Sequence, residues 1–541
     1  MFSGEELWFS RAQFYGEARF ERAQFGRIAM FDGVEFSEGA NFDEAQFSNV
    51  WFEHAQFSRN AAFERARFNG LTLFDGAQFC DDALFDAEFG GPVLFDNVHF
   101  YGTASFGGAK FHQDAGFEGV KFRQAAGFEG AEFRGGTRLK DALFSAGAQF
   151  NGARFKHEVV LGPLTVGNLS LAGAVFEHPV GMEVTAVRMS CVGTSWRGGV
   201  TMRLNDARVS LQRARFAALS SVAGMYPVSA GSVLSAPKLT SLQEVNTANL
   251  AVTDVDLSLC YFVGAQRLDQ IRLQGHCKFD SPPRGLRFGL AWPPVWWWSN
   301  RQTLAEERTW RATTRKYSGW FAASDTGSVP GGGPAASGIE AAVRAGTVTG
   351  TTESRSVGFP IEDAEDARSR LGGPQRDRRR LSTEGLGERL VPPELLVGLY
   401  RQLRKAQEDA KNEPGAADFY YGEMEMRRHA PTTPWPERLI VTAYWAISGY
   451  GLRATRALIT LALLILASAA LLRYTGFSGK APSYVHSLLY AGGSVLSLDL
   501  AVRNLPHVLT AWGAVIRIML RIAGPVCLAL AALALRGRVK R

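Results

Sequence analysis

Phenylalanine recurs along the first part of the chain at alternating intervals of five and six residues, and this repeat constrains the fold more than any other feature. It is established at Phe14, Phe20 and Phe25 and continues to Phe155. Of 27 such positions, Leu139 is the only one that is not phenylalanine. The residue two places earlier is small or compact at every position, with 20 alanines, 5 valines and 2 threonines. Self-similarity over so many units indicates a repeat architecture in which each unit packs on its neighbours.

An α-helix does not accommodate this repeat. At the roughly 98° per residue that an 11-residue period requires, phenylalanines five apart lie about 130° apart around the axis and share no buried stripe. Glycines such as Gly33 and Gly70 between the phenylalanines also lower helix stability. In an extended segment, residues two apart lie on the same side. We therefore predict that each unit is a short strand with two inward residues, followed by a turn.

Four such units, two of five residues and two of six, make one coil of 22 residues. Coils stack at about 4.8 Å, so the roughly seven coils before residue 155 make a rod about 33 Å long. Each buried phenylalanine contributes about 1.5–3 kcal/mol, which accounts for stability without implying any activity. Two units depart from the spacing, Phe47–Phe52 with five residues in place of six and Phe85–Phe89 with four. We expect local irregularities at both.

Units such as FERAQF, FDGAQF and FEGAEF resemble the pentapeptide-repeat family in its Phe-centred variant. The resemblance covers residues 9–155 densely and implies a mainly β fold, a right-handed quadrilateral β-helix. We assign residues 1–155 to this regular solenoid. Leucine, valine, methionine and tryptophan continue the spacing less regularly, so we assign 156–288 to degenerate coils with a loop insertion at 217–243.

Residues 289–321 are expected to form a tryptophan-rich cap and a short helix. The run GLAWPPVWWW combines four tryptophans with two prolines, which argues against a regular element. We favour a plug over the open end of the solenoid, whose last strand needs cover, over an aromatic ligand or membrane-interface patch. Ser299 or Asn300 then caps a helix that runs to Trp310.

Residues 322–390 are rich in small, polar and charged residues, and their apolar content is too low to offset the entropy of ordering. This composition predicts a disordered linker. An apolar stripe at helical spacing then predicts a helical hairpin over 393–430. The hairpin and the stretch LAVTDVDLSLCYFVGAQRLDQIRL resemble actinobacterial pentapeptide-repeat membrane proteins, so the resemblance spans nearly the whole chain apart from the linker.

Residues 435–541 read as a membrane region with two transmembrane helices, at about 456–473 and 512–535. In the first, 16 uncharged residues between Arg456 and Arg473 span about 24 Å, and the flanking arginines can snorkel. The second contains Arg521, whose charge is costly inside a bilayer. An interfacial helix with Trp435, Tyr444 and Trp445 is expected before the first span.

Charge is distributed unevenly along the chain. Residues 1–155 carry 14 basic and 22 acidic side chains, a net charge of −8. Because the whole chain has a net charge of +7, the remaining residues carry +15. Basic residues flank the start of the first span and the end of the second, with fewer between. The positive-inside rule therefore predicts a multi-pass protein of the bacterial cell membrane with both termini cytoplasmic. No signal peptide is evident, and a start further upstream is left open because the repeat begins almost at once.

The sequence offers no candidate catalytic, cofactor-binding or metal-ligating residue. It contains no HExxH, GxGxxG or GxSxG motif. His157 and Glu158 are adjacent on a strand and should point to opposite faces, while Asp81, Asp82 and Asp86 read as a solvated face. The five cysteines form no CxxC pair, which fits a reducing compartment. We predict a non-enzymatic protein without cofactors.

Three functions are compatible with these features. The first is a membrane-tethered scaffold whose cytoplasmic solenoid binds an unidentified protein partner. The second is an ion-channel-like or transport component built on the two spans and the segment 482–500, although no filter such as TVGYG follows a pore helix there and Gly449-Tyr450-Gly451 precedes the first span. The third is nucleic-acid mimicry by the acidic solenoid. We favour the scaffold, with the lipid bilayer as a second partner. No small-molecule substrate is evident, nucleic acid is disfavoured, and a homo-oligomer is left open.

Overall fold

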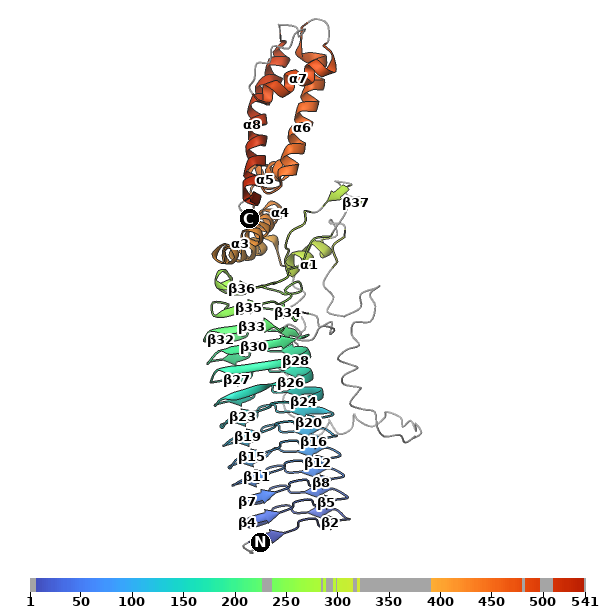
Figure 1. Cartoon of the computed structure of the whole chain (residues 1–541), viewed down its shortest axis with the longest axis vertical. Coiled ribbons are helices and arrows are strands. Elements are labelled where there is room, and N and C mark those ends of the chain that lie inside the picture. Colours follow the sequence, from blue (N-terminus) through green and yellow to red (C-terminus); the bar gives the residue numbers. More distant parts are fainter. Residues whose placement is uncertain are drawn as a thin grey trace, which may run out of the picture.

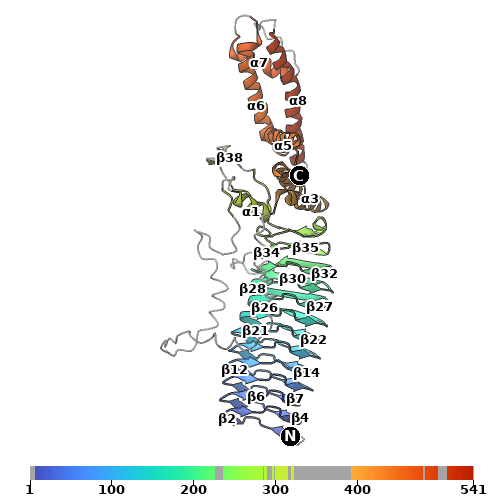
Figure 2. The ribbon, with the colours of Figure 1, turned by 180° about the vertical axis from the view of Figure 1, so that it is seen from behind.

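The chain forms an elongated molecule with a β-solenoid at its N-terminal end and a group of helices at the other (Figure 1). A computed structural model describes residues 6–225, 236–283, 286–288, 295–297, 299–314, 319–321, 391–478, 482–496 and 509–539. The same layout is seen from behind in Figure 2. The predicted linker 322–390 lies outside the described residues, apart from which the order of elements follows the sequence analysis.

The solenoid is a single sheet of 36 strands, and each strand pairing within it is parallel. About 12 turns stack along its axis. Most strands contain two residues, as in β2 (Gln13–Phe14), β3 (Ala18–Arg19) and β5 (Glu35–Phe36). The longer strands are β1 (Glu6–Trp8), β4 (Gln24–Met30), β7 (Gln46–Trp51), β21 (Ala125–Gly127), β24 (Leu143–Gln149), β26 (Val159–Ser170), β28 (Val180–Ser190), β30 (Val200–Asn205), β31 (Arg208–Ser210), β33 (Ser220–Gly224), β34 (Lys238–Ser241), β35 (Leu250–Thr253) and β36 (Arg272–Gln274). The predicted β-solenoid is confirmed.

The interior of each coil is filled by the repeat residues, which form four ladders along the axis. Successive rings in one ladder lie face to face, with centroids 4.6–5.0 Å apart and planes within 9° of parallel. Rings of neighbouring ladders can meet edge to face, as between Phe36 and Phe42 at 85°. The aromatic quadrupole favours edge-to-face pairs and parallel pairs whose rings are offset. The ladder that begins at Phe20 shows how far the stack extends. It comprises Phe20, Phe42, Phe63, Phe85, Phe106, Phe128 and Phe150, followed by Leu171, Cys191, Leu211, Leu242 and Phe262.

The alternation of five and six residues reflects two kinds of corner. The five-residue intervals contain a tight turn closed by a backbone hydrogen bond, as from Ala23 N–H to Phe20 O, with a left-handed residue such as Arg22 (φ 57°) or Gly33 (φ 62°). The six-residue intervals contain a wider corner. Different numbers of residues thus keep the four ladders in register.

Both irregular units lie at these corners, as predicted. At Phe47–Phe52, strand β7 continues through a wide corner with one residue fewer. At Phe85–Phe89, the tight turn is shortened, and Ala87 N–H bonds directly to Phe85 O at 2.8 Å. Stacking continues through both, since Phe52 and Phe89 remain in their ladders.

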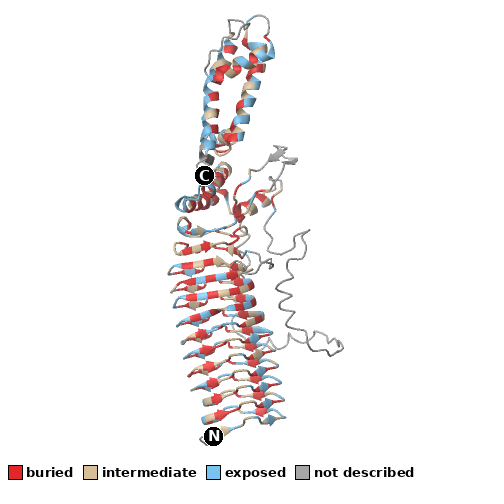
Figure 3. Ribbon diagram, viewed as in Figure 1, coloured by how far each residue is buried: buried red, intermediate tan, exposed pale blue. Residues whose placement is uncertain are grey.

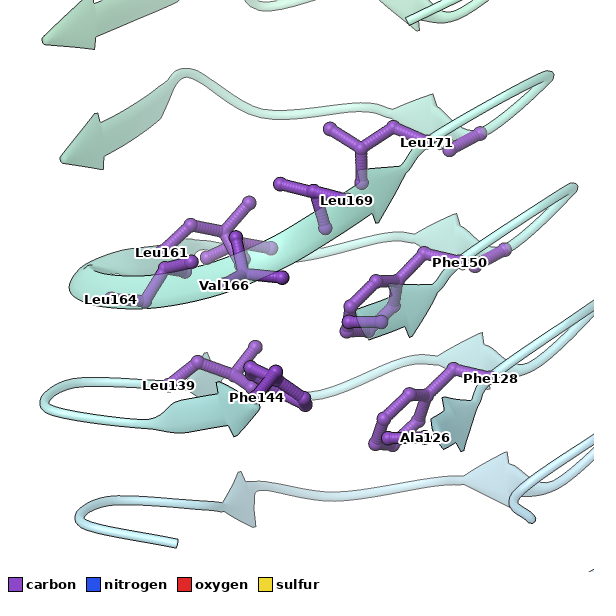
Figure 4. Close-up of a cluster of buried hydrophobic side chains, with 14 of the residues drawn as sticks. Ala126, Phe128, Leu139, Phe144, Phe150, Leu161, Leu164, Val166, Leu169 and Leu171 are labelled. Atoms are coloured by element: carbon purple, nitrogen blue, oxygen red, sulfur yellow. The ribbon is translucent and has the colours of Figure 1, made fainter. Parts of the chain in front are cut away.

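Beyond Phe155 the interior changes from aromatic to aliphatic without a break in the stack. Figure 4 shows Leu161, Val166 and Leu171 above the last phenylalanines. The fit is less complete there, with a void of about 10 Å³ between the leucines and the rings. Strands β26 and β28 also run continuously around a corner, which gives this part of the wall a broader face.

The predicted loop insertion at 217–243 is wrong in its bounds. Ser220–Gly224 and Lys238–Ser241 are strands β33 and β34, which pair with β30 and β31. The coil between Leu211 and Leu242 therefore contains about ten extra residues at one corner only, part of which lies outside the described residues. The two short strands were not recognised in the sequence because Val222 and Leu239 are their only apolar inward residues, and the other inward residues are Ser220 and Ser241.

The helices follow the solenoid in the predicted order. They are α1 (Ala305–Thr313), α3 (Pro393–Asp409), α4 (Glu413–His429), α5 (Trp435–Ser448), α6 (Ala454–Leu471), α7 (Tyr484–Val495) and α8 (Ala511–Val539), with a short 3₁₀ helix η1 (Leu268–Gln270) and a π-helical turn η4 (Leu472–Gly476). Helices α3 and α4 form the predicted hairpin, in which Asn412 caps α4 through a hydrogen bond from Gly415 N–H.

Two predictions for residues 289–321 are wrong. The run GLAWPPVWWW does contain a regular element, because Val295–Trp297 (β38) pairs antiparallel with Leu286–Phe288 (β37); residues 289–294 and 298 lie outside the described residues. This hairpin projects beside the helices rather than over the solenoid (Figure 1). Neither Ser299 nor Asn300 caps α1, which begins at Ala305 without a side-chain cap.

The ladders predict a graded response to substitution of Phe106, which is fully buried. We expect Phe106→Ala to lower the free energy of unfolding by about 3–5 kcal/mol, because it opens a cavity between two stacked rings. Phe106→Leu should cost less, since Leu139 occupies an equivalent position in another ladder. Denaturant unfolding followed by circular dichroism of the β signal measures both.

The matched control is Leu84→Ala, because the Leu84 side chain is 37% exposed on the outer wall. It should change the unfolding free energy by less than about 1 kcal/mol. Equal effects at positions 84 and 106 would contradict the assignment of stability to the ladders.

Candidate functional site: the junction between the solenoid and the apolar helices

The last coil of the solenoid is covered by helix α1. The backbone N–H groups of Phe262 and Val263, at the edge where another coil would pair, donate to Oε1 of Glu306; the bond from Val263 is 3.1 Å. Glu306 therefore satisfies donors that an uncovered edge would leave unpaired. Tyr261 and Thr309 join their hydroxyls at 3.2 Å beside it. The Glu306 carboxylate thus supplies the acceptor that the backbone carbonyls of a further strand would supply.

The hairpin closes the rest of this end. Gln402 on α3 accepts from the backbone N–H of Leu268 at 3.2 Å, and Lys405 pairs with Asp269 at 2.8 Å. Phe419 on α4 packs edge-on against Phe279 at 5.0 Å. Helices α1, α3 and α4 thus form the plug that the open end of the solenoid requires, while much of the tryptophan run lies outside the described residues.

Behind this cap lies a chain of buried charges that we call the junction network: Arg301, Glu307, Arg311, Glu425 and Arg428. Arg301 donates to both oxygens of Glu307 at 2.6 and 2.8 Å, and Arg311 Nε donates to the same carboxylate at 2.6 Å. Arg311 also reaches Glu425 on α4 at 3.2 Å, which Arg428 contacts at 3.1 and 3.2 Å. The side chains of Arg311 and Glu307 are wholly inaccessible to solvent. The charges alternate in sign, which burial requires.

Two tyrosines complete the network. Tyr400 on α3 donates to Glu307, and its hydroxyl also accepts from the backbone N–H of Leu304 at 3.1 Å. Tyr450 donates to Glu425 at 3.4 Å. Tyr450 is the centre of Gly449-Tyr450-Gly451, in which all three residues have left-handed backbone (φ 56°, 59° and 74°). The motif is a sharp turn between α5 and α6 that inserts a tyrosine into the junction.

The network holds its carboxylates ionised. Burial alone would raise the pKa of Glu425, but the charges of Arg428 and Arg311 outweigh it and lower that pKa to about 2. Glu307 is likewise held below its ordinary pKa by Arg301 and Arg311 in spite of burial. Burial lowers the pKa of His429 to about 4. Glu306 differs, since burial raises its pKa to about 7 and no cation pairs with it in the described structure.

The junction extends to the first apolar helix through aromatic rings. Arg428 lies 4.1 Å from the ring centroid of Trp445 and Arg456 lies 5.3 Å from it. Trp445 donates to the Tyr421 hydroxyl at 3.1 Å, and Arg453, just before α6, donates to the backbone carbonyl of Asn300. Contacts therefore run without interruption from the last coil to α6.

Helices α6 and α8 are long and apolar enough to cross a membrane, over Ala454–Gly476 and Ala511–Leu535. Both extend away from the solenoid, and most of their residues are exposed or only partly buried (Figure 3). Their far ends touch, because Gly513 packs against the backbone of Gly476 so closely that a Cβ would lie 2.1 Å from its carbonyl oxygen. Helix α7 lies between them, against Gly524.

Most of the residues singled out in the sequence analysis lie outside the junction network. Of the expected interfacial aromatics, Trp435 is exposed, whereas Tyr444 and Trp445 are partly buried against the junction. The ring of His157 stacks on His178 at 5.7 Å. Asp81 and Asp82 accept backbone hydrogen bonds in turns. Within the described residues, no group of three His, Cys, Asp or Glu side chains is arranged to hold a metal ion.

Sequence analysis did not identify the junction network, because its members are spread over residues 301–450 and each reads alone as a surface charge. The available signals were weak: two adjacent glutamates in a short helix, and a tyrosine between two glycines.

Comparison with known proteins adds a family for the solenoid. Residues 2–46 and 117–162 match the family described as pentapeptide repeats (9 copies). A search among curated proteins finds no match to the chain.

The network predicts a large local effect of Glu425→Gln. The substitution removes the charge partner of Arg428 and leaves Arg311 paired with Glu307 alone, so we expect helices α1 and α4 to lose about 3–5 kcal/mol of protection in hydrogen exchange at pH 7. In the wild type, the folded-state pKa is depressed, so this stabilisation is present above about pH 4.5 and is lost as pH falls through about 2. Glu437→Gln, at an exposed pair with Arg427, is the control and should cost less than about 1 kcal/mol.

For Glu306 we predict the opposite pH dependence of local stability, because its pKa is raised rather than lowered. Its folded-state pKa, about 7, lies above the ordinary value, so both states are protonated below about pH 4.5 and the folded state is progressively penalised between pH 4.5 and 7. Glu306→Gln keeps an acceptor for Phe262 and Val263 without a charge. We expect it to increase protection of these two amides by about 2–3 kcal/mol at pH 8 and not at pH 4. Reduced protection at pH 8 would show that the charge itself is needed.

Proposed function

Because the N-terminal part of this chain is a pentapeptide-repeat β-solenoid, we propose that the protein is a non-enzymatic scaffold, anchored in a bacterial membrane by α6 and α8, whose cytoplasmic solenoid binds a protein partner. The observation that carries the proposal is the junction network. A flexible tether needs no buried ion pairs, whereas this junction fixes the direction of the rod relative to the helices. A fixed direction is useful when the wall of the rod is a binding surface.

The arrangement of the helices supports a hairpin in the membrane. The start of α6 and the end of α8 lie together beside the junction, and α7 lies at the far end (Figure 1). If both helices span the bilayer, the solenoid and the C-terminus face the same side. Arg453, Arg456, Arg536 and Arg538 gather at the near end, which by the positive-inside rule is cytoplasmic.

The exposed apolar face of helix α5 supports placing the membrane surface beside this helix. Its outer face carries Trp435, Leu439 and Ile440, which are 76%, 63% and 66% exposed. Its inner face packs Val441 and Ser448 against the junction. An exposed apolar face beside the start of an apolar helix fits a helix lying in the headgroup region. The solenoid then begins directly beneath the membrane.

Cys80 is a native reporter of this topology, because it is the exposed cysteine of the solenoid. In intact cells, a membrane-impermeant maleimide should leave Cys80 unlabelled; permeabilisation of the inner membrane should expose it to labelling, and the protein should remain in the membrane fraction after carbonate washing. Cys80→Ser is the control for labelling at other cysteines. Labelling of Cys80 in intact cells would contradict a cytoplasmic solenoid.

Partner binding is tested in the same cells with a photo-crosslinking residue at exposed solenoid positions such as Leu84 and Val187. The proposal expects discrete protein adducts from the solenoid. Absence of adducts from every wall of the solenoid would contradict a scaffold role.

A further inference from the structure

Three cations form a column on the outer wall of the solenoid. Arg188 on β28 is in register with Arg208 on β31, and Arg208 is in register with Lys238 on β34. Arg188 is exposed and the other two are partly exposed. Neighbouring strands lie about 4.8 Å apart, so three like charges stack over roughly 10 Å. We call these residues the cation column.

Several cations elsewhere on the wall pair with an acid one coil away, as in Arg22–Glu44 at 2.7 Å, Arg138–Glu118 at 2.9 Å and Arg213–Glu244 at 2.9 Å. The column instead places three cations in register on successive coils, and an acid, Asp256, follows only after Lys238. Within the part of the chain that the structure describes, no member of the cation column has an ion pair or a side-chain hydrogen bond. Like charges on neighbouring strands repel, so the column opposes folding rather than assisting it.

A cleft of about 490 Å³ opens beside the column and is lined by Arg188 and Arg208 but not by Lys238. Small residues, Ala125, Ala146 and Gly147, keep its lower part free of side chains, and a Cβ at Gly147 would meet the backbone oxygen of Asn168 at 2.8 Å. The hydroxyls of Ser170, Ser190 and Ser210 follow one side of it, in register on successive coils. The cleft therefore presents cations and hydroxyls in parallel rows along the axis.

We propose that this cleft binds an extended acidic segment of the protein partner, with carboxylates over Arg188, Arg208 and Lys238 and backbone groups over the serine row. The proposal rests on the scaffold function above and specifies that the segment of the partner that binds the cleft is acidic. Alternate side chains of an extended segment lie about 6.8 Å apart, which long, flexible cationic side chains on a 4.8 Å ladder can meet.

Other anions fit the cleft less well. Among the residues that the structure describes, none of those lining the cleft is aromatic, whereas single-stranded nucleic acid is held by stacking of its bases on aromatic rings. The column lies on β28, β31 and β34, and the coils that contain Asp256 and Lys278 lie between Lys238 and the covering helices, so the column is separated from any membrane that α6 and α8 cross (Figure 1). A lipid headgroup in a bilayer therefore does not reach the column.

The test uses the full-length protein in detergent micelles and a fluorescein-labelled peptide of five Glu-Ser repeats, with binding followed by anisotropy. We expect saturable binding that weakens at high salt. Neutralising the column with Arg188→Gln, Arg208→Gln and Lys238→Gln together should weaken binding at least tenfold. The matched control, Arg67→Gln, Lys121→Gln and Lys140→Gln, removes three exposed cations elsewhere on the solenoid and should change binding less than twofold. Arg188→Lys with Arg208→Lys should retain binding within threefold.

Three outcomes would overturn the proposal. The first is an absence of peptide binding by the wild type, and the second is an equal loss in both triple variants. The third is a ten-nucleotide single strand that binds more tightly than the peptide and is released by the column variant, which would assign the cleft to nucleic acid. Failure of the cleft is distinct from failure of the scaffold. If crosslinked adducts persist in the column variant, the scaffold stands and the acidic segment does not.

Discussion

Face-to-face stacking of inward side chains is the interaction on which the rest of the structure depends. Aromatic rings stack at the same spacing, close to 4.8 Å, at which parallel strands form hydrogen bonds, so the interior and the backbone require the same repeat. Neither has to be strained to satisfy the other. This coincidence explains how strands of only two residues, too short to persist alone, form a continuous sheet.

A stack of this kind has no intrinsic end, and its last coil exposes donors and a hydrophobic interior. The chain covers this end with buried polar and ionised side chains rather than with more apolar surface. Glu306 meets the unpaired backbone of the last coil, and the alternating charges from Arg301 to Arg428 hold the covering helices in one arrangement. Buried ion pairs contribute little net stability, but removing one partner is costly, so they specify one geometry of the junction.

The sequence predicts those parts of the structure that depend on local periodicity. The Phe ladders, the helical hairpin and the two apolar helices all follow from spacing and composition. Even the short turn at Phe85–Phe89 can be recognised in the sequence, because this interval is one residue shorter than the repeat requires. The junction is not predictable in this way, because its contacts join residues such as Arg301 and Tyr400 that are far apart in sequence. The cation column was missed for a related reason. Register across coils of unequal length decides that Arg208 meets Lys238, thirty residues later, and the strands flanking that corner carry little hydrophobic signal.

The corners that absorb extra or missing residues give the solenoid the properties of a ruler. Coil length varies at the corners, yet each coil adds the same rise, so the reach of the rod depends on the number of coils and not on the number of residues. Its roughly 12 turns extend about 58 Å from the junction. Duplication or loss of one whole coil would move every distal wall position by about 4.8 Å relative to the membrane while leaving the cap, the network and the apolar helices unchanged. Distance from the bilayer is thus a quantity that such a chain can alter in equal steps.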